Sequence, residues 1–218
     1  MTRGDTADRP VGPVAVFGAG GHASVAMDVL TAAGYTVAAC LTPGGSGEKR
    51  GVPILDEVEG IRILRAQGVR RAHVALGDNV LRERVTAMVQ GEGFDLVSAI
   101  SPTASVADDV EVGAGTLVVH GAVVNVGTRL GAGVIVNTLA SVDHDGDIGD
   151  FAHIAPGTHL AGNVTVGARS LLGVGTSVIP ETTIGHDVVV GAGSVVVTHL
   201  DSTVRAWGNP ARTRKAAS

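Results

Sequence analysis

One histidine in the second half of the chain lies between two aspartates, in the run Asp143-His144-Asp145. Histidine gains or loses a proton near neutral pH, and a hydrogen-bonded carboxylate makes its ring a stronger base. Such a set can take a proton from an amine or hydroxyl group as that group attacks a carbonyl carbon. The same residues are also common in exposed polar turns, so from the motif alone both interpretations stay open.

A second group with possible chemistry is the glycine-rich segment from Gly18 to His22, which follows the apolar run 14–17 and precedes residues with helical spacing. A loop between a strand and a helix suits contacts with phosphate or sugar groups. From the residues alone it could also bind a dinucleotide. Against that, Thr42 and Pro43 follow the second predicted strand, where an acidic residue would hold a ribose.

The element that must position His144 is a repeat. Every sixth residue from Ile100 to Val196, seventeen in all, is Ile, Val or Leu, and a mostly small residue follows four positions later. This period predicts short strands separated by turns, with three strands, or about 18 residues, closing one coil of a parallel β-helix. Gly162 follows His144 by 18 residues, so it should stack beside the ring. Its N–H group could stabilise an oxyanion, or it could be one more corner glycine.

The first half alternates between strand and helix patterns, which predicts a small parallel α/β domain. Strands are expected at 14–17, 35–41 and 72–76, and helices at 25–33, 58–66 and 80–90, with a loop at 42–50. The predicted organisation is a loose tail, an α/β domain, a β-helix and a C-terminal tail, over residues 1–12, 13–98, 99–200 and 201–218.

Composition excludes several classes of protein. The 218 residues are 44% hydrophobic and only 2% aromatic, with a formal net charge of −5 and no basic patch, which argues against a nucleic-acid partner. No apolar run is long enough to span a membrane, and the first twelve residues do not resemble a signal peptide. Cys40 is the only cysteine, so no disulfide can form within the chain. A cytoplasmic protein is therefore expected.

Four segments together resemble the hexapeptide-repeat sugar acetyltransferases of the sialic acid O-acetyltransferase and UDP-bacillosamine-pathway N-acetyltransferase group. They are the stretch 136–164 around the Asp-His-Asp motif, the loop 18–22, the turn 77–79 and the segment 208–211. The resemblance implies a Rossmann-like α/β domain followed by a left-handed β-helix. It also implies acetyl-CoA as co-substrate, a sugar or nucleotide-linked sugar as acceptor, and a homotrimer with active sites between neighbouring prisms.

The resemblance also assigns roles to individual residues. It implies that His144 is the general base and that Asp145 increases its basicity. Contacts with acetyl-CoA are implied for His153, Gly162, Val174 and Ala192, and contacts with the acceptor for Gly20, Gly21, His22, Gly77, Asp78 and Asn137. The chain departs from the nucleotide-sugar enzymes at Thr42-Pro43, where those enzymes carry two aspartates.

Two other functions remain as alternatives. A zinc lyase similar to the γ-type carbonic anhydrases would need two of its three histidines five residues apart, and His144, His153 and His159 do not have this spacing. No metal is therefore expected. A non-catalytic trimeric assembly module is the third possibility, and the intact Asp143-His144-Asp145 set argues against it.

Overall fold

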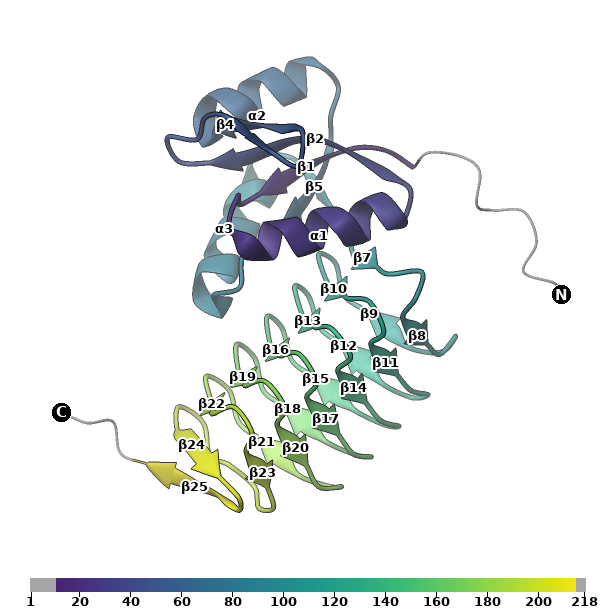
Figure 1. The fold of residues 1–218 in the computed structure, drawn as a ribbon, viewed down its shortest axis with the longest axis vertical. Helices are drawn as coiled ribbons and strands as arrows, with labels where there is room; N and C mark the ends of the chain where they lie inside the picture. Colours follow the sequence, from purple (N-terminus) through teal and green to yellow (C-terminus); the bar gives the residue numbers. More distant parts are fainter. Residues whose placement is uncertain (1–10, 215–218) are drawn as a thin grey trace, which may run out of the picture.

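The computed structural model describes residues 11–214, which form an α/β domain above a β-helix (Figure 1). The α/β domain contains one six-stranded sheet in the order β3-β4-β2-β1-β5-β6, in which only the β3–β4 pair is antiparallel. The strands are β1 (Gly12–Phe17), β2 (Tyr35–Thr42), β3 (Glu48–Lys49), β4 (Val52–Asp56), β5 (Arg71–Val74) and β6 (Asp95–Leu96). The predicted strands and helices are present, but β3, β4 and β6 were not predicted.

Helices cover both faces of this sheet. Helix α1 (Gly21–Ala32) packs on one face, while α2 (Glu57–Ala66) and α3 (Asn79–Gly91) pack on the other. Asp56 caps α2 by accepting hydrogen bonds from two backbone N–H groups, and Asp78 caps α3 in the same way through Leu81 N. Helix α1 begins after Gly20 with no side-chain cap, so its first N–H groups stay open to a ligand.

The second half is a parallel β-helix with three sides, as the repeat predicts. Each of the seventeen aliphatic residues is the second residue of a two-residue strand and points inward, where most are fully buried. Strands stack with an 18-residue register, for example Val118 against Val136. The first side contains β7 (Ala99–Ile100), β10 (Leu117–Val118), β13 (Ile135–Val136), β16 (His153–Ile154), β19 (Leu171–Leu172) and β22 (Val189–Val190).

The other two sides have the same construction. The second side contains β8 (Ser105–Val106), β11 (Val123–Val124), β14 (Ser141–Val142), β17 (His159–Leu160), β20 (Ser177–Val178) and β23 (Val195–Val196). The third side contains β9 (Glu111–Val112), β12 (Arg129–Leu130), β15 (Asp147–Ile148), β18 (Thr165–Val166) and β21 (Thr183–Ile184). Beyond these, β24 (Arg205–Gly208) and β25 (Ala211–Arg214) form a hairpin that extends the first side, within the segment expected to be a tail.

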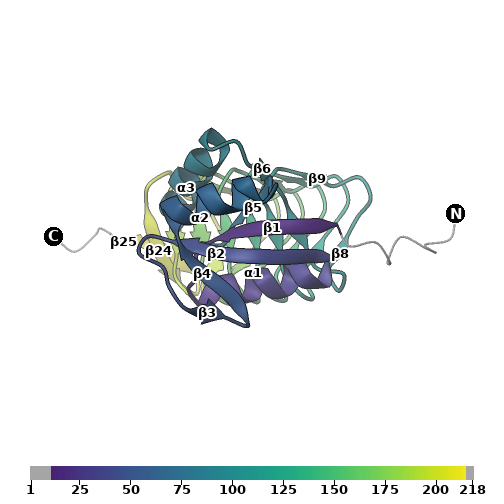
Figure 2. The same cartoon turned by 90° about the horizontal axis from the view of Figure 1, so that it is seen from above.

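The α/β domain lies on the first side of the β-helix, at its first coils (Figures 1 and 2). Ala99, Leu117 and Ile135 face outward from this side in one column, and they are buried in a cluster that includes residues of α1. His153 is the next residue of that column. It therefore lies where the cover of α1 ends. Within residues 11–214, no helix has the length and apolarity needed to cross a membrane.

Candidate active site

His144 and Asp145 form a hydrogen-bonded pair in the turn between β14 and β15, at the corner where the second and third sides meet. Nδ1 of His144 lies 2.8 Å from Oδ2 of Asp145. A carboxylate can only accept, so the ring proton is on Nδ1 and the lone pair is on Nε2. The hydrogen bond to Asp145 raises the pKa of His144, with a smaller contribution from the charge of Asp143. The pair therefore has the tautomer and the basicity of a general base.

The turn itself holds these side chains in place. Asp145 adopts the left-handed backbone conformation, with φ 59°, which aspartate tolerates better than most residues. Asp143 accepts hydrogen bonds from Nδ2 of Asn125 at 2.8 Å and from the backbone N of His144 at 2.9 Å. These two bonds lower the pKa of Asp143, so it stays ionised beside the histidine.

Gly162 lies one coil further along, directly against the His144 ring. A Cβ atom at this position would overlap Nε2 and Cε1 of His144, so only glycine leaves the ring in place. The backbone N–H of Gly162 donates to no other group among the described residues. An open N–H donor beside the free nitrogen of the base is the arrangement that an oxyanion requires.

A second polar group gathers between α1 and the first side of the β-helix. The rings of His22 and His153 have centroids 6.2 Å apart, and Nδ2 of Asn137 lies 3.0 Å from Nε2 of His153. Nε2 of His22 is buried without a hydrogen-bond partner, whereas the remaining ring nitrogen of His153 lies near the Gly77 backbone, which raises its pKa against the effect of burial. A buried polar atom without a partner is costly, so Nε2 of His22 is the atom of this group that is open to a ligand.

The electrostatics of this second group are opposite to those of the first. Burial, together with the positive charge of Arg82, lowers the pKa of His22 to about 4 and that of His153 to about 3. Both rings are therefore neutral across the range in which His144 changes its charge.

The structure does not bring all the predicted site residues into one place within a chain. His144, Asp145 and Gly162 lie on the corner between the second and third sides, which is opposite the first side that carries His153. Val174 and Ala192 lie on another corner, between the first and second sides. One chain therefore carries the parts of the predicted site on separate faces of its prism.

The predicted acceptor residues other than Asn137, which follows β13 on the β-helix, lie at the carboxyl edge of the α/β sheet. Gly20 and Gly21 leave open space at the start of α1, and His22 follows them. Gly77 and Asp78 follow β5, where the Asp78 side chain is already used to cap α3 through a bond of 2.8 Å to Leu81 N.

A pocket of about 520 Å³, which the sequence patterns do not predict, lies at the same edge. Its lining is mostly apolar, with Thr42, Glu57 and Arg84 as its hydroxyl and charged groups. The only sign of it in the sequence is the Thr42-Pro43 pair. The full lining is Phe17, Gly18, Leu41, Thr42, Pro43, Glu57, Leu76, Leu81, Arg84, Val85 and Met88.

No group of three or more His, Cys, Asp or Glu side chains that could hold a metal ion occurs in the described part of the chain.

Comparisons with known proteins show which proteins the chain resembles in sequence and fold. A family model described as the PglD N-terminal domain matches residues 13–89. GDP-perosamine N-acetyltransferase of Escherichia coli O157:H7 is 27% identical over 149 residues, which are 66% of this chain and 67% of that protein. Perosamine N-acetyltransferase of Caulobacter crescentus, with one histidine replaced by asparagine and with CoA and GDP-perosamine bound, is 42% identical. The match covers 94% of this chain and 98% of that one, with a TM-score of 0.92.

A similar match is the acetyltransferase domain of PglB from Neisseria gonorrhoeae in complex with acetyl coenzyme A. It is 36% identical, the match covers 93% of this chain and 98% of that one, and the TM-score is 0.87.

The lowered pKa values of His22 and His153 predict a loss of stability in acid. The unfolded chain binds these protons near the ordinary histidine pKa of 6.5, whereas the folded chain binds them only near about 4 and about 3. The free energy of unfolding is therefore highest above pH 6.5. It decreases as the pH falls toward 4, by up to about 1.4 kcal/mol per pH unit for each ring.

Thermal unfolding between pH 7 and 4.5 measures this loss. His22→Asn should make the dependence shallower, and His159→Asn, at an exposed position of the β-helix, should not. A wild-type melting temperature that stays constant over this range would contradict the assignment.

Proposed function

The chain belongs to the sugar N-acetyltransferases of the PglD and bacillosamine-pathway group and uses acetyl-CoA as co-substrate, and we propose that its acceptor is a nucleotide-linked sugar. In this proposal the chain acetylates the amino group of that sugar, with His144 as general base. The observation that carries the proposal is the close packing of the His144 ring, held by Asp145, against Gly162, whose backbone N–H group is not used by another described residue. We include in this proposal the cytoplasmic location that the sequence predicts.

The geometry supports direct transfer. Nε2 of His144 takes a proton from the acceptor amine as the amine nitrogen attacks the thioester carbonyl carbon. The carbonyl oxygen becomes an oxyanion and accepts a hydrogen bond from Gly162 N–H. When the tetrahedral intermediate collapses, the C–S bond breaks, the amide remains on the sugar, and the proton on His144 passes to the departing CoA sulfur. Asp145 stabilises the positively charged ring between these two proton transfers.

The site is completed by a second copy of the chain in this proposal. His144 lies on the corner opposite the first side, whereas the chain's own acceptor-binding loop lies over the first side. A neighbouring prism can bring its corner against this face. The homotrimer that the resemblance implies places three such contacts around one axis.

The pocket beside Thr42 is our candidate site for the base of the nucleotide. Its apolar lining suits a flat ring, and the open N-terminus of α1 suits a diphosphate. The Glu57 carboxylate can accept two hydrogen bonds from adjacent donors, which guanine offers at N1 and at its 2-amino group. The Caulobacter crescentus relative binds GDP-perosamine. We therefore favour a GDP-linked amino sugar as the acceptor.

Replacing the base tests the mechanism. His144→Ala should lower kcat by about 10²–10⁴ without unfolding the protein, because corner side chains point away from the core. Asp145→Asn should cost less. It should also move the acidic limb of the rate profile to lower pH, because the hydrogen bond that raises the pKa of His144 is weakened.

Release of CoA with a verified acceptor measures both effects. Near-normal turnover by His144→Ala would rule out general-base catalysis by this residue.

Mixing two inactive variants tests the shared site. His144→Ala lacks the base and His22→Ala lacks a ring of the acceptor group, so each alone should be weakly active. After equal amounts of the two are unfolded and refolded together, about a quarter of all sites, which is a third of those in mixed trimers, combine two intact halves. Activity should then rise well above that of either variant, and light scattering should show a trimer. A monomer at micromolar concentration, or no gain on mixing, would contradict the shared site.

An acceptor screen tests the choice of nucleotide. Equivalent 4-amino sugars linked to GDP, UDP and dTDP should give the highest kcat/KM with GDP. Glu57→Gln should reduce that preference by about tenfold or more, the effect of losing one charged hydrogen bond. Glu59→Gln is the matched control, because Glu59 lies in the same first turn of α2 but pairs with Arg62. Equal rates with UDP would contradict the guanine assignment.

A further inference from the structure

Arg82 of α3 is the largest fully buried side chain of the described chain, with 1% of its surface exposed. All five of its side-chain N–H groups have an acceptor, which is the full capacity of a guanidinium. Nε donates to Gly133 O at 2.8 Å, Nη1 to Leu76 O at 2.9 Å and Gly77 O at 3.4 Å, and Nη2 to Asn79 Oδ1 at 2.9 Å and Phe151 O at 2.7 Å.

These acceptors come from different parts of the fold. Leu76 and Gly77 follow β5 in the α/β domain, while Gly133 and Phe151 lie on successive coils, at the corner between the third and first sides. A single side chain therefore fixes the Gly77 loop against the β-helix. This loop is part of the predicted acceptor site, and it lies beside His153, whose pKa the Gly77 backbone influences.

The positive charge of Arg82 has no carboxylate in contact with it, since its acceptors are four backbone carbonyls and one amide. Burial lowers its pKa to about 10, against the opposing charge of Asp78, so it stays a cation at neutral pH. An unpaired buried cation acts over a longer range than one that is neutralised by a partner.

We propose that Arg82 is a positioning residue for the acceptor. It holds the Gly77 loop, His22 and His153 in one arrangement across the domain junction, and its charge disfavours further positive charge on that arrangement. The inference rests on the proposed function, because it assigns the acceptor to this group of residues.

The charged and titratable groups around the two rings fit this role. His22 faces His153, Arg82 and His73, and His153 faces His22 and Arg82. His73 is itself buried and hydrogen-bonded to Val97 O, and its pKa is also lowered, chiefly by burial. None of these neighbours is an acid, and only the Gly77 backbone raises the pKa of His153 against the larger effects of burial and of Arg82. An acceptor that carries an ammonium group is disfavoured in the same field, and the neutral amine, which is the reactive form, is favoured.

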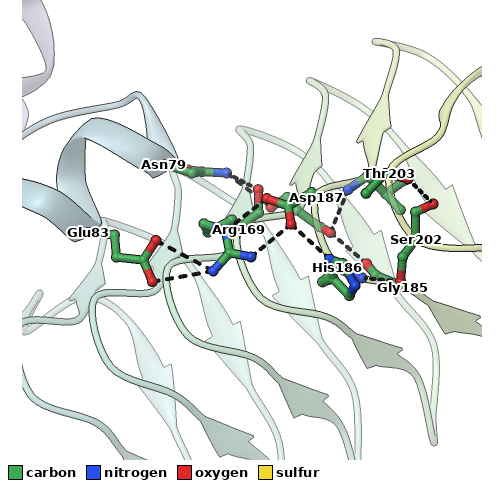
Figure 3. A network of polar contacts seen from close by, with 10 residues as sticks. Asn79, Glu83, Arg169, Gly185, His186, Asp187, Ser202 and Thr203 are labelled. Atoms are coloured by element: carbon green, nitrogen blue, oxygen red, sulfur yellow. Dashed lines mark hydrogen bonds and ion pairs between the residues drawn. The ribbon is translucent and has the colours of Figure 1, made fainter.

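A neighbouring ion pair between the same helix and the same corner provides a matched control (Figure 3). It is linked to Arg82 only through Asn79, which accepts from Arg82 and donates to the backbone oxygen of Arg169. Glu83 of α3 forms an ion pair with Arg169 at 3.3 Å, and Arg169 is also bound to Asp187 at 2.7 Å. This network joins the two parts of the chain without touching Gly77, His22 or His153. Weakening it loosens the junction and leaves the surroundings of the acceptor group intact.

The test compares Arg82→Gln, Arg82→Lys and Glu83→Gln, each checked for folding by circular dichroism. Arg82→Gln should raise the KM for the acceptor by about 10- to 100-fold, since several charged hydrogen bonds are lost. The KM for acetyl-CoA should rise less, because His153 is the only residue of this group for which a contact with acetyl-CoA is expected. Arg82→Lys keeps the charge but has only three donors, so the KM for the acceptor should also rise. Glu83→Gln should lower the melting temperature and leave this KM unchanged.

Imidazole titration by NMR gives a readout that does not depend on activity. The resonances of His22 and His153, assigned with single His→Asn variants, should titrate at clearly higher pH in Arg82→Gln and stay low in Arg82→Lys. Unchanged titration in Arg82→Gln, or an equal rise in the acceptor KM with Glu83→Gln, would overturn the inference. If Arg82→Gln does not fold, the acceptor KM of Arg82→Lys against Glu83→Gln decides. If the protein acetylates no amino sugar, the proposed function fails, and the titrations still decide the electrostatic role.

Discussion

The stacking of coils at an 18-residue register is the constraint on which the rest of this structure depends. Each coil hydrogen-bonds to the next, and every sixth residue must be an aliphatic side chain that points into one core. Chemistry is therefore restricted to corners and to outward columns. His144 occupies a corner, and the register places Gly162 against its ring. His153 occupies the outward column that begins under α1 with Ala99.

The α/β domain provides an edge at the carboxyl ends of its parallel strands, with loops of variable length, which a stack of coils does not have. Its three helices differ in how their first N–H groups are capped. Asp56 and Asp78 satisfy the first N–H groups of α2 and α3, whereas Gly20 leaves those of α1 free. The first N–H groups of α2 and α3 are thus closed by the chain itself, whereas those of α1 are open, as the diphosphate contact that we propose requires.

The predictability of each part from sequence depends on how local its cause is. The β-helix could be predicted strand by strand, because its core is a property of spacing, and Gly162 beside His144 followed from the same spacing. The two-residue strands β3 and β6 could not, since so short a segment carries no periodic pattern. Arg82 could not either, because it contacts Gly133 and Phe151, 51 and 69 residues away in the chain. The separation of His144 from His153 is likewise visible only when the coil is closed.

The two groups of histidines are held in opposite protonation states by their environments. His144 is half exposed and bound to a carboxylate, which favours its charged form. His22 and His153 are buried beside a cation, which favours their neutral forms. A base must be able to take up a proton, whereas the surroundings of a reactive amine must not supply one. Within one chain these environments lie on opposite sides of the prism, so neither field weakens the other. In the trimer that we propose, assembly brings the base of one chain to the acceptor group of another, and each keeps the protonation state set by its own surroundings.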